Sequence, residues 1–207
     1  MLIQQNRGEC MNYIDKINNY LKNSGGIILA SYCRKENIPT IYLTRLTKEG
    51  KLVKIANGLY ITKKANYDEF YFFQYRFKKA IFSYETALFL LGATDKIPDI
   101  IDVTIYNNYK FNNKPNKVNI HYVNKKLYDL GIIEIKTIYG NSVKVYSYER
   151  ILCDFISHKE QMDTETYIKF IRFYSKYEKK DIHKLYEMAK EMNIIETVKD
   201  IMEIVYE

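Results

Sequence analysis

The order of segments in the first 62 residues constrains the fold more than any other feature of the sequence. Residues 11–22 carry apolar side chains three or four positions apart, which indicates one face of a helix. Residues 27–36 and 40–49 predict a second and a third helix, separated at Pro39 and ended by Gly50. Two short strand-like runs then flank Asn57-Gly58, a dipeptide typical of tight hairpin turns. The segment therefore predicts three helices followed by a β-hairpin.

That order is typical of a winged helix-turn-helix, in which the third helix enters the major groove of DNA. On this helix Leu43 and Leu46 fall on a side suited to packing. Arg45 falls opposite and suits a bidentate contact with guanine, whereas Lys48 suits a phosphate. The alternative is that this side is only the solvated face of an amphipathic helix. The residues predicted to contact DNA are Arg34, Lys35, Thr40, Tyr42, Thr44, Arg45, Lys48, Lys54, Asn57, Lys63 and Lys64.

The distribution of charge favours a polyanionic partner for the N-terminal part. The whole chain carries +7, but residues 1–79 alone hold 14 Lys and Arg against 6 Asp and Glu, a net +8. Residues 80–180 sum to +3 and residues 181–207 to −4. Basic side chains that neutralise phosphates release condensed counterions and so favour binding. A bias toward lysine in coding would spread the excess evenly, so the asymmetry favours nucleic-acid binding by the N-terminal part.

The rest of the chain predicts a second domain that contains both strands and helices. Runs rich in β-branched residues predict strands at residues 101–106, 117–123, 132–139 and 142–146. Helical patterns occur at residues 83–91, 148–158, 164–177, 181–192 and 194–205. We therefore predict an α+β chain with a winged helix-turn-helix in residues 1–79. Residues 80–207 are predicted to form a small, mostly antiparallel sheet with helices on one side.

Aromatic residues are concentrated between residues 67 and 82. Basic residues among aromatic ones can indicate a surface for single-stranded nucleic acid, on which bases stack. Phe70, Phe73 and Phe77 are three or four positions apart, which instead favours a packed helix. We predict the packed helix and retain an RNA-binding module as an alternative.

No catalytic motif is present: the sequence has no phosphate-binding loop, dinucleotide fingerprint or nucleophile elbow. His121, His158 and His183 are far apart, and none lies near a cysteine at the spacing of a metal site. We interpret His121 as a surface or edge residue and the other two as helix-end residues. We therefore expect no catalytic residue, no cofactor and no metal ion.

The cysteines and the hydropathy pattern point to a cytoplasmic protein without a membrane partner. Cys10, Cys33 and Cys153 are widely spaced and odd in number, which argues against a disulfide framework. No apolar run approaches the length of a membrane-spanning helix, and the N-terminus lacks the apolar region of a secretory signal.

Glu149, Arg150 and Asp154 share one predicted helix. Arg150 and Asp154 are four positions apart and can form an ion pair. Glu149 and Asp154 are separated by about 140° around the helix, so they do not face one side as a catalytic carboxylate pair would. We interpret the three as structural or as an interaction surface of the second domain. An enzyme that modifies a partner protein or a nucleic acid is the alternative.

The chain resembles a known family at several places. Residues 38–62, IPTIYLTRLTKEGKLVKIANGLYIT, resemble the N-terminal winged helix of AbiEi-like antitoxins of type IV abortive-infection toxin–antitoxin systems. Residues 84–92, YETALFLLG, are similar to the helix that opens the second domain of that family. Residues 148–154, YERILCD, are similar to its Glu-Arg-x-x-x-Asp helix, and residues 181–206 to its last helical pair.

The resemblance implies a bifunctional protein of phage defence. The winged helix would bind inverted repeats in the promoter of its own operon and repress transcription, which is autoregulation. The second domain would counteract a toxin with a nucleotidyltransferase fold, directly or indirectly. The expected partners are therefore double-stranded DNA and that toxin. One form compatible with this role is a monomer that binds DNA cooperatively.

Overall fold

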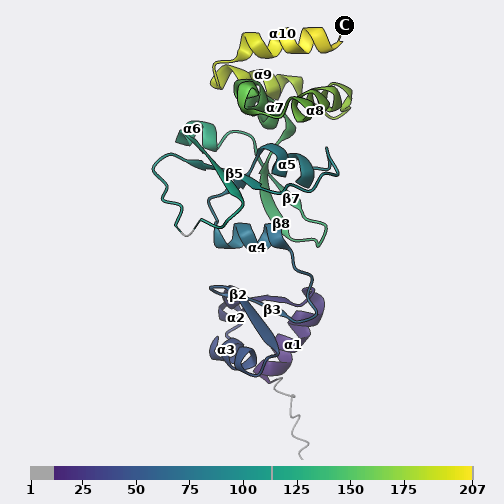
Figure 1. Cartoon of the computed structure of the whole chain (residues 1–207). Helices are drawn as coiled ribbons and strands as arrows, with labels where there is room; N and C mark the ends of the chain where they lie inside the picture. Colours follow the sequence, from purple (N-terminus) through teal and green to yellow (C-terminus); the bar gives the residue numbers. More distant parts are fainter. Residues whose placement is uncertain (1–11, 113, 207) are drawn as a thin grey trace, which may run out of the picture. The chain divides into compact units, whose positions relative to one another are not determined.

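The computed structural model describes residues 12–112 and 114–206 (Figure 1). Cys10, the predicted helix start at Met11 and the terminal Glu207 lie outside the described residues. About 47% of the chain is helical and 19% is in strands, so the predicted α+β class is confirmed. The chain divides into two compact units, Met1–Arg76 (unit 1) and Phe77–Glu207 (unit 2). Among the described residues, no helix combines the length and the apolar character needed to cross a membrane.

Unit 1 combines short helices with a three-stranded sheet. Each strand pair in the sheet is antiparallel, and the strand order is β1-β3-β2. The elements in chain order are α1 (Tyr13–Asn23), β1 (Ile27–Leu29), α2 (Ala30–Lys35), α3 (Ile41–Lys48), β2 (Leu52–Ala56), β3 (Leu59–Thr62) and α4 (Glu69–Arg76).

The prediction of one helix over residues 27–36 is wrong in its first turn. Ile27–Leu29 instead form β1, which pairs with Leu59–Ile61 of β3, and the helix begins only at Ala30. Ile28 is fully buried in this sheet. The run of Ile and Leu suits either a helix or a strand, and the partner strand that decides between them lies about 30 residues further along the chain.

The third helix and the hairpin form as predicted. Leu43 and Leu46 on α3 are 1% and 3% exposed and belong to the core of unit 1. Gly50 ends the helix with a φ of +71°, and the N–H of Lys51 donates to the carbonyl oxygen of Leu46 at 2.9 Å. β2 and β3 pair on either side of the turn that contains Gly58, whose φ is +80°.

The aromatic segment forms a helix, but only part of the predicted face is buried. Phe73 on α4 and Phe77 after it are 9% and 8% exposed, whereas Phe70 is only partly buried. Phe72, which the spacing did not select, is 4% exposed and packs with Leu59 and Ile61 of unit 1. These rings therefore serve mainly to pack the fold.

Unit 2 is built on a five-stranded sheet with the order β6-β5-β4-β8-β7. Its four C-terminal helices gather together, with α7 packed against α8, α9 and α10 and also against α5 (Figure 1). The elements in chain order are β4 (Ile81–Phe82), α5 (Tyr84–Leu90), β5 (Ile101–Tyr106), β6 (Val118–Val123), α6 (Lys125–Tyr128), β7 (Ile132–Lys136), β8 (Ser142–Tyr146), α7 (Tyr148–Ser157), the 3₁₀ turn η1 (Lys159–Gln161), α8 (Thr164–Lys176), α9 (Ile182–Glu191) and α10 (Ile195–Tyr206).

The prediction of a mostly antiparallel sheet is wrong, because the sheet is mixed. β4 pairs antiparallel with β5 but parallel with β8, and β5 pairs parallel with β6. Of the strands predicted from the sequence, only β7 and β8 pair as in a simple antiparallel meander. The two-residue strand Ile81–Phe82 lies at the centre of the sheet, and its shortness hides it from pattern analysis.

Candidate functional sites

The exposed side of α3 carries the residues predicted to reach DNA. Because residues three or four apart share a helix face, burial of Leu43 and Leu46 leaves Thr44, Arg45 and Lys48 in solvent. In the described part of the chain, no carboxylate lies within ion-pair distance of Arg45 or Lys48. Both cations therefore remain available to an external anion.

Arg45 lies beside an aromatic pair. Its guanidinium carbon is 5.3 Å from the centre of the Tyr42 ring, and that ring is 5.5 Å from the ring of Tyr13 on α1. A guanidinium over a tyrosine face gains a cation–π attraction and loses part of its freedom. The two tyrosines thus orient Arg45 on the surface of α3.

The remaining residues predicted to bind DNA are also at the surface. Tyr42 is half-buried, and all the others are exposed: Arg34, Lys35, Thr40, Thr44, Arg45, Lys48, Lys54, Asn57, Lys63 and Lys64. The ammonium of Lys63 lies beside the end of α3, 3.8 Å from where a Cβ on Gly50 would be. The structure therefore brings one lysine that follows β3 next to the third helix.

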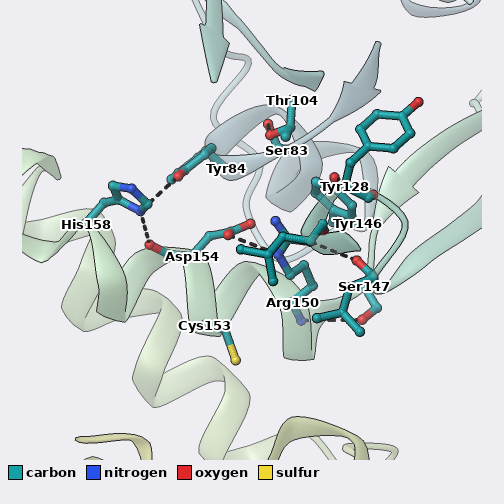
Figure 2. Close-up of polar contacts among 12 residues, drawn as sticks. Ser83, Tyr84, Thr104, Tyr128, Tyr146, Ser147, Arg150, Cys153, Asp154 and His158 are labelled. Atoms are coloured by element: carbon teal, nitrogen blue, oxygen red, sulfur yellow. Dashed lines mark hydrogen bonds and ion pairs between the residues drawn. The ribbon is translucent and has the colours of Figure 1, made fainter. Parts of the chain in front are cut away.

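In unit 2, the ion pair between Arg150 and Asp154 is buried (Figure 2). Arg150 Nε donates to Asp154 Oδ1 at 3.0 Å, and the two side chains are 1% and 4% exposed. Other parts of the guanidinium also have partners. Nη1 donates to the carbonyl oxygens of Leu127 and Leu130, and the guanidinium carbon lies 4.2 Å from the centre of the Tyr146 ring.

The backbone makes room for this arginine at Gly131. Gly131 has a φ of +77°, and a Cβ there would lie 2.7 Å from Cβ of Arg150. Its carbonyl oxygen accepts from the N–H of Ser147, the residue that caps α7. Glycine is therefore required both for the backbone conformation and for the close approach of α7.

Glu149, Arg150 and Asp154 do not form an accessible interaction surface, which corrects that part of our interpretation. Glu149 is 7% exposed, and its Oε1 accepts from the Tyr174 hydroxyl at 3.4 Å and from the Asp181 N–H at 3.2 Å. Although the three residues share one helix, each side chain is directed toward the interior of unit 2. The ion pair allowed by the spacing of Arg150 and Asp154 does form.

Asp154 has one carboxylate oxygen without a protein partner. Oδ2 is buried and accepts no hydrogen bond from the described residues. Burial raises the pKa of this carboxyl, although the charges of Arg150 and of two histidines oppose the rise. These histidines are His158 and His121.

Tertiary structure brings together His121, His158 and Tyr84, which lie far apart in the sequence. The Tyr84 ring stacks on His121 with 3.9 Å between centres, and the Tyr84 hydroxyl is 3.1 Å from Nδ1 of His158. His121 Nε2 is 2.9 Å from Asp102 Oδ1. Because an ionised carboxylate can only accept a hydrogen bond, His121 Nε2 is the donor in this contact.

The backbone of Tyr84 is unusual at the same place. Its φ is +48°, a left-handed value that costs energy for a tyrosine, and burial raises the pKa of its phenol far above 10. A pocket of about 300 Å³ is lined by Tyr84, His121 and His158 together with Asp102 and Asn119. No sequence motif marks these residues, because they come from separate strands and helices.

Comparison with known proteins adds no family to these observations. No protein-family model matches the sequence, and no curated protein matches it. In the described residues, no group of three His, Cys, Asp or Glu side chains is placed to hold a metal ion.

Proposed function

We propose that the chain is a DNA-binding antitoxin that represses its own toxin–antitoxin operon. In this proposal unit 1 acts as a winged helix-turn-helix and α3 enters the major groove of an inverted repeat. The observation that carries the proposal is the exposed face of α3, where Arg45 and Lys48 have no acidic neighbour within ion-pair distance in the described chain. The net +8 of residues 1–79 adds the attraction to a polyanion.

The residues of this face have distinct roles in the proposal. Arg45, oriented by the Tyr42 ring, pairs with O6 and N7 of a guanine, and Lys48 neutralises a phosphate. Thr40 and Tyr42 bond a phosphate or contact a thymine methyl group. The lysines in and after the hairpin track the DNA backbone as a wing: Lys54, Lys63 and Lys64.

Unit 2 takes the second task in this proposal, which is to counteract a toxin with a nucleotidyltransferase fold. This part depends on the resemblance of residues 84–92 and 148–154 to AbiEi-like antitoxins. Because Glu149, Arg150 and Asp154 are buried, they support this role only by holding unit 2 together. Other surfaces of unit 2 would have to meet the toxin if contact is direct.

The DNA part is tested by a gel shift on the promoter of the operon that encodes the chain. We expect a discrete complex at low salt that a random duplex of equal length does not compete away. Arg45→Ala should lose the preference for the promoter, whereas Lys22→Ala on α1, outside the predicted DNA face, should not. Absence of any complex at low salt would remove the proposal for unit 1.

The antitoxin part is tested by co-expression with the neighbouring gene, which in this proposal encodes the toxin. We expect the full chain to restore growth and the Arg45→Ala variant to restore it equally well, because the two tasks lie in different units. Failure of the wild-type chain to restore growth would contradict the role of unit 2 and leave DNA binding unaffected.

A second candidate for unit 2 is proton-transfer catalysis, favoured by the pocket that joins the Asp102–His121 pair to the Tyr84 hydroxyl. Groups of this kind act as general bases and acids when a substrate lies within hydrogen-bond distance. His121→Gln removes the imidazole while keeping a polar side chain of similar length. Full toxin neutralisation by His121→Gln would exclude a catalytic role in that process.

A further inference from the structure

From Val103 in β5 to Tyr128 at the end of α6, the chain has no acidic residue. Residues 103–128 contain five lysines and no Asp or Glu, and residues 77–84 add Lys78 and Lys79, again without an acid. Residues 129–207 of the same unit hold 12 Lys and Arg against 15 Asp and Glu. The basic charge of unit 2 is therefore concentrated in two segments.

The structure joins these two segments. The ring of Phe77 stacks on that of Phe111 with 4.4 Å between centres. The Tyr128 hydroxyl donates to the carbonyl oxygen of Lys79 at 2.8 Å. Residues 77–79 therefore lie against both the β5–β6 connection and α6.

Aromatic rings lie among the lysines at this place. Tyr106 at the end of β5 makes an edge contact with Tyr109, with 5.5 Å between centres, and both rings are half-buried. The ammonium of Lys125 is 5.4 Å from the centre of the Tyr106 ring. Lys110 directly follows Tyr109 and is exposed.

The lysines differ in how far they are neutralised inside the protein. Lys125 pairs with Asp129 at 2.6 Å, and Lys126 pairs with Glu191. Within the described chain, Lys79 and Lys110 have no carboxylate at ion-pair distance. These two cations are thus free to meet an external phosphate.

We propose that Lys79, Tyr106, Tyr109 and Lys110 form a surface of unit 2 that binds single-stranded nucleic acid. Lysines follow the phosphates, and a partly exposed tyrosine ring offers a platform on which a base stacks. Stacking requires an unpaired base, which favours a single strand over a duplex. The surface belongs to unit 2 and does not depend on whether α3 binds an operator.

The test measures binding of labelled RNA and DNA single strands of about 12 nucleotides by fluorescence anisotropy. The full-length chain carries Arg45→Ala and Lys48→Ala throughout, so that the face of α3 contributes little. A duplex of the same length is the third ligand. Affinity is measured between about 50 and 200 mM salt.

Two sets of substitutions separate charge from stacking. Lys79→Gln with Lys110→Gln should flatten the slope of log affinity against log salt by about 1.4, which corresponds to two phosphates of a single strand. Tyr109→Leu should weaken binding about 5- to 150-fold, the range for loss of one stacked base, and Tyr109→Phe should retain most of the affinity. The matched control Lys176→Gln with Lys190→Gln removes equal charge from exposed positions of α8 and α9.

The outcomes discriminate between the alternatives. An equal loss of affinity in the Lys79/Lys110 and Lys176/Lys190 double variants would mean that only net charge matters, and it would overturn the proposal. Tighter binding of the duplex, unaffected by Tyr109→Leu, would also overturn it. RNA bound more tightly than DNA would identify RNA as the ligand, and equal affinity would identify single strands in general. A promoter gel shift without a complex would refute the function proposed for unit 1 and leave this result unchanged.

Discussion

Arg150 and Asp154 lie one turn apart on α7 and form an ion pair, 3.0 Å between Nε and Oδ1, that is almost entirely removed from solvent. Removing two charges from water costs several kcal/mol, so such a pair persists only where hydrogen bonds and packing compensate. Here the carbonyl oxygens of Leu127 in α6 and Leu130 after it, together with the Tyr146 ring, surround the guanidinium. Loss of one partner is therefore more damaging than replacement of both.

We expect Asp154→Ala to lower the free energy of unfolding of unit 2 by about 3–5 kcal/mol, because it leaves Arg150 buried and unpaired. The double variant Arg150→Met with Asp154→Leu should lose less than the single variant. Urea denaturation followed by circular dichroism measures both. A double variant that is less stable than Asp154→Ala would show that the charges themselves, rather than their pairing, hold the unit together.

Gly131→Ala should destabilise unit 2 by about 2–5 kcal/mol, because the left-handed backbone and an overlap of atoms add together. The new Cβ would lie 2.7 Å from Cβ of Arg150. Gly140→Ala is the matched control, since Gly140 has a similar φ of +81° with no atom within 4 Å of the Cβ position. Equal thermal shifts for the two variants would contradict the importance of the contact with Arg150.

The thiols of Cys33 and Cys153 should resist alkylation in the folded protein. Both side chains are fully buried, and burial raises the pKa of Cys153 to about 12 and also raises the pKa of Cys33. Since the thiolate is the reactive form, labelling at about pH 8 should require unfolding. A Cys10→Ser variant removes the third thiol, so that Ellman's reagent counts only these two. Rapid labelling of either thiol in native buffer would disprove its burial.

Unit 2 should lose stability between about pH 10 and pH 12. Burial raises the pKa of Tyr128 and of Tyr148 to about 12, whereas tyrosines of an unfolded chain ionise near 10. Between these values the folded state holds more protons, so the free energy of unfolding falls as pH rises and is unaffected below about pH 10. Urea midpoints with absorbance of tyrosinate measure the loss. Tyr128→Phe and Tyr148→Phe should each reduce the fall of the urea midpoint with pH. An unchanged fall in both variants would refute tyrosine ionisation as its cause.

Arg45→Ala and Lys64→Ala should affect DNA binding differently. A bidentate contact with guanine is worth about 1–3 kcal/mol of discrimination, so Arg45→Ala should bind the promoter and an altered half-site equally. Lys64→Ala should weaken all duplexes alike and lower the salt slope by about 0.9. Anisotropy titrations at several salt concentrations measure both effects. Identical profiles for the two variants would remove the assignment of Arg45 to a base.

Strong local signals were sufficient for much of the secondary structure. The Asn57-Gly58 turn, the buried pair Leu43 and Leu46, and the bounds of β5 and β8 follow from side-chain period and turn chemistry, which act over a few residues. The spacing of Arg150 and Asp154 likewise permitted their ion pair. Such features depend on neighbours within one helix turn or one hairpin, so they can be predicted from a short stretch of sequence.

Long-range pairing decided the rest. Ile27–Leu29 form a strand because they pair with the free edge of β3. Ile81–Phe82 form the central strand of a mixed sheet because β5 pairs with them on one side and β8 on the other. The same pairing turned His121 toward Asp102 and Tyr84, and α7 brought His158 to the tyrosine hydroxyl. Composition and period do not encode which strands become neighbours, since that choice minimises the exposed apolar area and the unpaired backbone groups over the whole unit.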